Sequence, residues 1–274
     1  MKAALIDNGS LEPDAHRNLR RIAALVGELA GIAVDAVSWK HSDRIPETAL
    51  GGRKALTLEA WVRDEVAGGE REFVFIPFFV CPQGAVGSCL RGDLEALALE
   101  TGMEFTFTAG LSSDLASIAA ERAFETVTSL GLDRPAVILV DHGGPAAASA
   151  GVRNAVSNGM REVLGKSIGP LSAASMESPD GPEFQFNRPL FSELLSSPAF
   201  AARDTVVVPL FLAPGRHAGH GGDLERIARA WEARRPGLRC HFTGLVGTHP
   251  RVPGILALPL RAATRISNLQ LETP

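Results

Sequence analysis

The sequence of 274 residues contains no tyrosine, so phenolic acid–base chemistry is excluded. Its three cysteines, Cys81, Cys89 and Cys240, are too few and too scattered for a disulfide framework or a zinc site. No apolar stretch approaches the roughly 20 residues of a membrane span. The formal net charge of −4 and the absence of a stripe of Lys and Arg argue against a nucleic-acid partner.

What remains is the composition of a soluble globular protein, with 45% apolar and 21% charged residues. The apolar run at the N-terminus is too short for a signal peptide and is broken by Asp7, so we expect a cytoplasmic protein. The length accommodates two domains of about 100–150 residues each.

Three passages of the first half recur in the second half, in the same order and at nearly constant spacing. The pairs are Leu5–Gly9 with Leu139–Gly143 (139 minus 5, or 134), 77–85 with 209–217 (209 minus 77, or 132), and Gly92–Glu95 with Gly222–Glu225 (222 minus 92, or 130). Collinear matches of this kind indicate an internal duplication. We therefore predict one domain over residues 1–132 and a second over residues 133–274, with the boundary in Gly131–Pro135.

Both halves alternate short apolar runs with amphipathic helical patterns such as Asn18–Leu29. The predicted strands are Ala3–Asp7, Ala33–Val37, Phe73–Phe79, Glu104–Thr108, Ala136–Val140, Ser167–Ala174, Thr205–Leu212 and Arg239–Thr243. Near-continuous apolar runs suit parallel sheets covered by helices on both faces. The predicted fold is α/β, with two tandem doubly wound, Rossmann-like domains.

The stretch from Ser175 to Pro198 departs from this pattern. Pro179, Pro182 and Pro189 predict that no helix begins before about Pro189. Long irregular segments in compact α/β domains often carry function, and a plain surface loop is an equally good interpretation here.

Ligands of parallel sheets bind beyond the carboxyl ends of the strands, which draws attention to His142 and His217. Each follows a predicted strand of the second half, whereas Asn8 and Ala85 hold the corresponding positions of the first. Two imidazoles at one sheet edge could bind a divalent metal or exchange protons. Each could instead hydrogen-bond its own loop, but the loss of both from the sister half favours function.

Glu177 is the third candidate, because it lies just past the strand predicted over Ser167–Ala174 and so on the same rim. Its alternative role is that of a solvated loop glutamate. The corresponding stretch Ser38–Ser42 has no carboxylate. His220 and His249 are weaker candidates, and the glycine-rich stretch 215–222 lacks the Lys-Ser/Thr of a phosphate-binding loop.

These residues resemble those of the class II chelatases, the sirohydrochlorin cobaltochelatase and ferrochelatase family of cobalamin and siroheme synthesis. The resemblance rests on the strand ending in His142-Gly143, on Val206–His217 with its Gly215-Arg216-His217, and on Gly247–Pro250, with Glu177 at the place of the family's glutamate. It covers the whole chain if the protein is a double-length member with two such domains, the first of them degenerate. Gly144-Pro145 stand where the family usually has Ser-Arg.

The resemblance implies insertion of a divalent metal, Co²⁺ or Fe²⁺, into sirohydrochlorin or a related tetrapyrrole, without an organic cofactor. His142 and His217 would bind the metal (Co²⁺, Fe²⁺ or Ni²⁺ as substrate), and His142, Glu177 and His217 would be the catalytic residues. The expected partners are the tetrapyrrole and the metal ion, without nucleic acid or membrane. Two alternatives remain open: a non-catalytic tetrapyrrole or metal carrier on the same fold, and an unrelated hydrolase using a metal-bound water.

Overall fold

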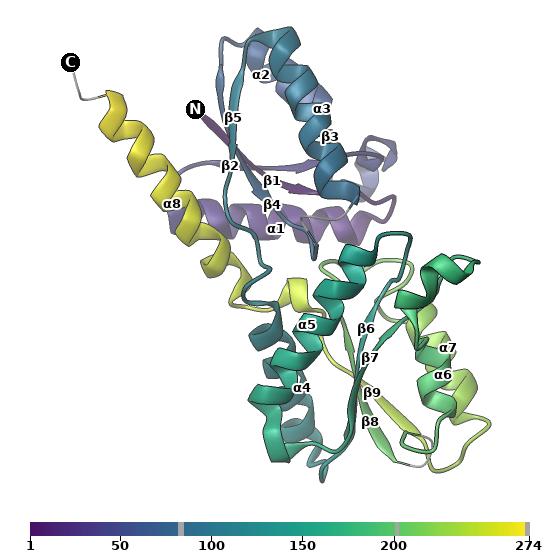
Figure 1. Cartoon of the computed structure of the whole chain (residues 1–274). Coiled ribbons are helices and arrows are strands. Elements are labelled where there is room, and N and C mark those ends of the chain that lie inside the picture. The colour runs from purple at the N-terminus through teal and green to yellow at the C-terminus, as the bar shows by residue number, and fades with distance from the viewer. Residues whose placement is uncertain (82–84, 201–202, 272–274) are drawn as a thin grey trace. The chain divides into compact units, whose positions relative to one another are not determined.

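The computed structural model describes residues 1–81, 85–200 and 203–271, including all their side chains except those of 85–88 and 265–271. The chain forms two compact units. The first consists of Met1–Leu111 with Pro250–Pro274, and the second of Ser112–His249. Each unit contains one parallel β-sheet (Figure 1).

The sheet of the first unit has the strand order β3-β2-β1-β4-β5. Its strands are β1 (Lys2–Asp7), β2 (Val34–Ser38), β3 (Leu56–Thr57), β4 (Glu72–Pro77) and β5 (Glu104–Phe107). Its α-helices are α1 (Pro13–Ala30), α2 (Leu58–Ala67), α3 (Ala85–Thr101) and α8 (Val252–Leu271). The two-residue strand β3 was not predicted, because it is too short to show a periodicity.

The sheet of the second unit has the order β7-β6-β8-β9. Its strands are β6 (Ala136–Asp141), β7 (Leu171–Ser175), β8 (Asp204–Pro209) and β9 (Arg239–Phe242). Its α-helices are α4 (Leu115–Leu130), α5 (Ala147–Leu164), α6 (Phe191–Ser196) and α7 (Asp223–Glu232). Apart from β3, the two sheets have the same order of strands, and the predicted α/β fold with two parallel-sheet domains is confirmed.

The central strand of the second unit explains why its sequence is continuously apolar. All six residues of β6 are buried. In Figure 1, α4 and α5 cover one face of the sheet, and α6 and α7 cover the other. A strand with helices on both faces needs apolar side chains in both directions, which the run Ala-Val-Ile-Leu-Val supplies.

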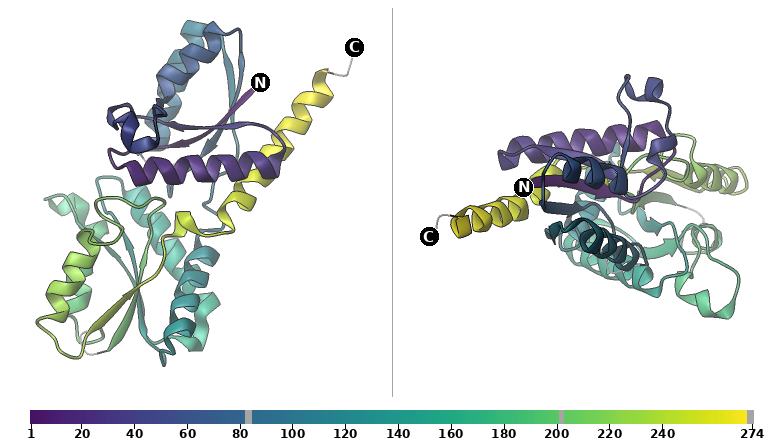
Figure 2. Two further views of the ribbon diagram at one scale, coloured as in Figure 1. Left: turned by 180° about the vertical axis from the view of Figure 1, so that it is seen from behind. Right: turned by 90° about the horizontal axis from the view of Figure 1, so that it is seen from above.

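The compact units do not follow the predicted repeat boundary at residue 132. Helix α4 precedes that boundary but packs against α5 of the second unit, and the C-terminal helix α8 packs against α1 of the first. The crossing of α8 over α1 is visible in Figure 1 and in the left view of Figure 2. The last helix of each half of the sequence thus packs in the unit formed mainly by the other half. The division into 1–132 and 133–274 stays a prediction about the repeat.

Several predicted bounds are wrong: the strand expected over Phe73–Phe79 ends at Pro77, and the strand expected over Ser167–Ala174 begins at Leu171. The strand expected over Thr205–Leu212 ends at Pro209, so residues beyond it are free to form the loop that carries His217. A short 3-10 helix, Pro182–Asn187, forms before Pro189, and its first residue is a proline. A proline fits there because the first amide of a helix has no acceptor within the helix. The first α-helix after this stretch, α6, does begin beyond Pro189.

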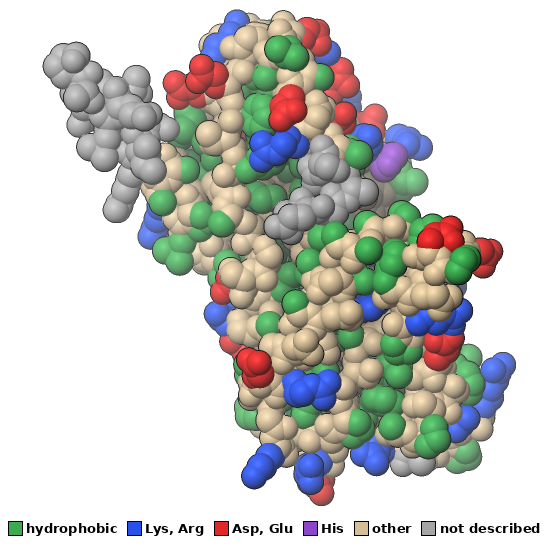
Figure 3. All heavy atoms as spheres, viewed as in Figure 1, with side chains coloured by type: hydrophobic (Ala, Val, Ile, Leu, Met, Phe, Trp, Pro, Cys, Tyr) green, Lys and Arg blue, Asp and Glu red, His purple; other side chains and the backbone are tan. Residues whose placement is uncertain are grey.

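The surface is mixed in charge. On the face seen in Figure 3, the described basic and acidic side chains are interspersed, with no continuous basic stripe among them. Among the described residues, no helix combines the length and apolar character needed to cross a bilayer.

Helix α8 supplies the first testable prediction. Leu256 is fully buried and Leu258, two residues on, is 67% exposed. We expect Leu256→Ala to lower the free energy of unfolding by about 2–5 kcal/mol through the cavity it leaves. The matched control Leu258→Ala should change it by less than about 0.5 kcal/mol. Urea unfolding followed by circular dichroism measures both, and equal losses would contradict the burial of this face of α8.

Candidate active site

The three predicted site residues follow three neighbouring strands of the second sheet. His142 directly follows β6, Glu177 lies two residues after β7, and His217 lies in the loop after β8. Strand β6 pairs in parallel with both neighbours, with Asp141 opposite Ser175 and Val140 opposite Pro209. The carboxyl ends of the three strands therefore meet at one edge.

The side chains converge as predicted. The imidazole rings of His142 and His217 have centroids 4.7 Å apart and are inclined by 77°. Nε2 of His142 is 3.4 Å from Oε1 of Glu177. The side chains of His142, His217 and Glu177 are 45%, 32% and 59% exposed, so a ligand can reach all three.

Hydrogen bonds fix which nitrogen of each imidazole is available. Nδ1 of His142 is 2.8 Å from the backbone oxygen of Gly143, and Nδ1 of His217 is 2.6 Å from Oδ2 of Asp223. Carbonyl and carboxylate oxygens only accept, so each Nδ1 carries the hydrogen when the ring is neutral. Both rings then carry their lone pair on Nε2, which in His142 lies 3.4 Å from Oε1 of Glu177.

The exits of β6 and β7 touch at Gly143. The amide of Glu177 donates to the backbone oxygen of His142 at 3.1 Å. Gly143 has φ of +84°, and a Cβ there would lie 2.0 Å from the backbone oxygen of Glu177. Only glycine fits where the two backbone segments approach so closely, and this close crossing places His142 beside Glu177.

The glycine-rich stretch 215–222 forms a loop that closes on itself. Leu224 donates its amide to the backbone oxygen of His217 at 3.2 Å, so the chain returns to its starting point. A Cβ on Gly222 would come within 3.0 Å of that same oxygen, and Gly221 has φ of +73°. The glycines allow this return, and it brings Asp223 against His217.

A buried charge network lies beneath His142. Asp141 and Arg153 are 8% and 1% exposed, with Arg153 Nη1 3.5 Å from Asp141 Oδ1. The Ser175 hydroxyl donates to Asp141 at 2.6 Å and accepts from Arg153. Burial raises the pKa of Asp141, and the Ser175 hydroxyl and the Arg153 guanidinium oppose that rise. The network ties β6, β7 and α5 together at the site.

The proline-rich segment contributes Asn187, which is 2% exposed and was not singled out from the sequence. Its side-chain amide donates to the backbone oxygen of Gly144 at 2.9 Å and accepts from the amide of Gly144 at 3.2 Å. Arg153 also donates to the backbone oxygen of Phe186 at 2.9 Å. Part of this irregular segment therefore clamps the loop that carries His142.

Asp223 is the second residue that sequence reasoning did not assign a role. Its hydrogen bonds to Arg226 and His217 hold the pKa of the carboxyl below its usual range, so it is ionised. The signal for it was present, because Gly222–Glu225 is one of the three duplicated passages.

The remaining histidine candidates lie apart from this cluster in their contacts. His220 is 95% exposed, with Nδ1 3.7 Å from Oε2 of Glu225. His249 is 4% exposed, with Nε2 3.4 Å from Oε2 of Glu121 on α4.

Within the described residues, no three His, Cys, Asp or Glu side chains form a ready-made metal site. Two imidazole nitrogens leave most coordination positions of a first-row ion open. Such a pair suits an ion that is handed on to another ligand, with Glu177 as the neighbouring carboxylate.

The corresponding edge of the first unit has the same backbone path and different side chains. Lys40 donates its amide to the backbone oxygen of Asn8 at 3.2 Å, as Glu177 does to His142. Gly9 repeats the crossing of Gly143, with φ of +87°. Asn8 and Lys40 thus replace His142 and Glu177. The side chain of Ala85, the predicted counterpart of His217, lies outside the described residues.

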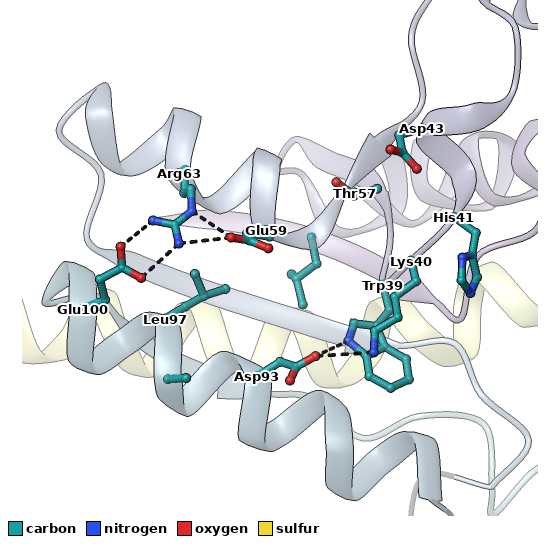
Figure 4. Close-up of a pocket in the computed structure, with 12 residues that line it drawn as sticks. Trp39, Lys40, His41, Asp43, Thr57, Glu59, Arg63, Asp93, Leu97 and Glu100 are labelled. Atoms are coloured by element: carbon teal, nitrogen blue, oxygen red, sulfur yellow. Dashed lines mark hydrogen bonds and ion pairs between the residues drawn. The ribbon is translucent and has the colours of Figure 1, made fainter.

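Figure 4 shows what surrounds Lys40. A pocket of about 510 Å³ is lined by Trp39, Lys40 and Asp93 among others. Asp93, the repeat partner of Asp223, accepts from Nε1 of Trp39 at 2.8 Å and lies 3.9 Å from Nζ of Lys40. The aspartate at this position of the repeat therefore accepts from an indole N–H in the first unit and contacts an imidazole in the second.

Residues 175–263, which include Glu177 and His217, match the protein-family model CbiX. No curated protein matches the sequence. SirB from Bacillus subtilis with Fe³⁺ aligns with a TM-score of 0.66, at 15% identity and over 98% of each chain. The sirohydrochlorin chelatase SirB from Bacillus subtilis subspecies spizizenii in complex with cobalt aligns with a TM-score of 0.65, also at 15% identity and over 98% of each chain.

A third solved structure is that of CbiX, described as the terminal enzyme for biosynthesis of siroheme in denitrifying bacteria. It aligns with a TM-score of 0.59 at 17% identity, over 96% of this chain and 99% of its own. The chain has the fold of these chelatases. The fold and the partial family match agree with the predicted resemblance, whereas membership among double-length chelatases stays a prediction.

The aspartate at the end of the central strand has different neighbours in the two halves, and this difference gives a second prediction. Asp7 has no arginine at the position of Arg153, where the repeat places the buried Leu19 (153 minus 134). Burial raises the pKa of Asp7 to about 6. A raised folded-state pKa means that ionisation destabilises the fold as pH rises through about 6.

Asp7→Asn should therefore increase the free energy of unfolding by about 1–2 kcal/mol above pH ~7 and by little near pH ~4. Asp141→Asn is the matched control, and it should destabilise the protein at neutral pH because it leaves Arg153 buried without its ion pair. Urea unfolding at both pH values measures the difference, and a loss of stability in both variants at neutral pH would refute it.

Proposed function

We propose that this protein is a metal chelatase that inserts a divalent ion, Co²⁺ or Fe²⁺, into sirohydrochlorin or a related tetrapyrrole. The observation that carries the proposal is the convergence of two imidazoles and a carboxylate at one exposed sheet edge. The family match over residues 175–263 and the cobalt-bound and iron-bound structures of similar fold support it.

The first step is metal capture. Nε2 of His217 and Nε2 of His142 are the ligands, since each Nδ1 is engaged with a fixed acceptor. Neutral imidazole binds first-row divalent ions well, and a pair leaves positions open for the ring nitrogens of the substrate. The metal is a substrate here and must leave, which a complete protein cage would prevent.

The second step is removal of the two pyrrole protons. Glu177 is 59% exposed and close to His142, so its carboxylate can accept a proton at the edge where the macrocycle meets the metal. Glu177 can take up the two protons in turn and pass each to solvent, because its side chain is exposed. No nucleotide or organic cofactor is required in this scheme.

A carrier that binds a tetrapyrrole or a metal without turnover is the second candidate. Gly144-Pro145 at the place of the family's Ser-Arg favours it, because the loop lacks a cationic side chain for substrate carboxylates. An anaerobic assay with sirohydrochlorin and Co²⁺ or Fe²⁺, followed by absorbance, separates the two. Formation of metallated product above the uncatalysed rate supports the chelatase, and binding without product supports the carrier.

The histidines give the third prediction. His142→Ala and His217→Ala should each lower kcat/KM for Co²⁺ by about 100-fold or more, because each removes a ligand. Melting temperatures should change little, since both side chains are partly exposed at loop positions. Asn8→Ala in the first unit and His220→Ala are the controls and should retain activity. Equal losses in Asn8→Ala and His142→Ala would contradict a single site in the second unit.

The carboxylate gives the fourth prediction. Glu177→Gln should lower kcat by about 10²–10⁴-fold with little change in the KM for Co²⁺, because it removes a base and leaves the ligands. Protons compete with the metal for imidazole nitrogens, so lower pH should raise the KM for Co²⁺ in the wild type and the variant alike. Initial rates over a grid of pH and Co²⁺ concentration test this. A Glu177→Gln variant whose defect disappears at high Co²⁺ would assign Glu177 to metal binding instead.

A further inference from the structure

Asp223 bridges one of the candidate ligands and an arginine. Its Oδ2 accepts from Nδ1 of His217 at 2.6 Å, and its Oδ1 accepts from Arg226. Nε of Arg216 lies 3.8 Å from the same Oδ2. The carboxylate therefore has one oxygen for the imidazole and another for the guanidinium of Arg226, and its side chain is only 20% exposed.

The backbone holds this pair in place. Asp223 is the first residue of α7, and its amide donates to the backbone oxygen of Arg216 at 3.1 Å. Together with the bond from Leu224 to His217, this closes the loop from Arg216 to Leu224 on itself. His217 and Asp223 are thus fixed relative to each other by main-chain contacts as well as by their side chains.

The two imidazoles are oriented by different means. His142 is held by the backbone oxygen of Gly143, which no substitution of that residue's side chain can remove. His217 is held by the ionised side chain of Asp223. A carboxylate that accepts from one nitrogen of a histidine fixes its tautomer and makes the other nitrogen a better ligand.

We propose that Asp223 is a positioning residue, which keeps the hydrogen of neutral His217 on Nδ1 and leaves Nε2 free for the incoming metal ion. The role in metal delivery rests on the proposed function, while the tautomer does not. Arg226 supports Asp223 by occupying its other oxygen.

Asp223→Asn is the informative substitution because it is nearly isosteric. Arg226 can only donate, so the amide oxygen should turn to Arg226 and the NH₂ group to His217. The imidazole must then accept at Nδ1 and carry its hydrogen on Nε2, where the metal should bind. The tautomer would be the wrong one, with the geometry of the loop preserved.

The tautomer is measured directly, without substrate. Nitrogen-15 NMR of histidine-labelled protein, at a pH where imidazole is neutral, reports which nitrogen carries the hydrogen, and a His217→Gln variant assigns the signal. We expect Nδ1–H for His217 in the wild type and a shift toward Nε2–H in Asp223→Asn. A wild type with Nε2–H, or a variant with an unchanged tautomer, would overturn the proposal.

The functional readout is the KM for Co²⁺. Asp223→Asn should raise it by roughly 10-fold to 100-fold, and Asp223→Glu, which can still accept from Nδ1, should recover part of the loss. Asp93→Asn is the control, because Asp93 holds the same place in the repeat and serves Trp39 instead of a histidine; its KM should stay at the wild-type value.

A purely structural role is the competing explanation, since an aspartate at the start of α7 also stabilises the helix. That role predicts a lower melting temperature for Asp223→Asn with an unchanged tautomer and an unchanged KM, and this result would overturn the proposal. If the wild type binds Co²⁺ but inserts none into sirohydrochlorin, the proposed function fails, and the NMR comparison still decides the part played by Asp223.

Discussion

The parallel pairing of β6 with both β7 and β8 is the constraint on which the candidate site depends. It brings three strand exits to one edge, and each exit supplies one of the three side chains. Glu177 and His217 lie far from His142 in sequence, so the proximity of the three side chains does not come from their spacing along the chain. What matters is that the three strands are neighbours and run in the same direction. A slip in either register would shift the exits relative to one another, and the contact between Gly143 and Glu177 allows almost no such shift.

Around this edge, the site is supported from three directions. Arg153 and Asp141 hold β6 to α5 from below, Asn187 clamps Gly144 from the proline-rich segment, and Asp223 holds His217 from the start of α7. Each support uses a polar group that is mostly buried and bonded on more than one side. Polar groups of this kind stabilise the fold only when all are satisfied, so they also fix one arrangement of the loops.

The first unit has the strand order of the second around its central strand, with different side chains at the corresponding edge. The close crossing at Gly9 persists, yet Asn8 and Lys40 stand where the second unit has His142 and Glu177. The buried Leu19 holds the place of Arg153, so Asp7 lacks the arginine that Asp141 has beside it. These changes lie at strand ends and loops, while the strands that form the core stay apolar. A fold can keep its core while the side chains at this edge differ, because the core and the edge use different residues.

The sequence by itself determined the α/β class and all but β3 of the strands in the described part of the chain, and it predicted the internal duplication and the candidate side chains His142, Glu177 and His217. These follow from local periodicity and from comparing one half with the other, both of which a single sequence contains. The tertiary structure alone decided the exchange of α4 and α8 between the units, because equally amphipathic helices can pack on either sheet. It also decided the partners of the site: Asn187 against Gly144, and Asp223 against His217. Those contacts depend on the backbone conformation of loops rich in glycine and proline. No short sequence pattern predicts the path of such loops.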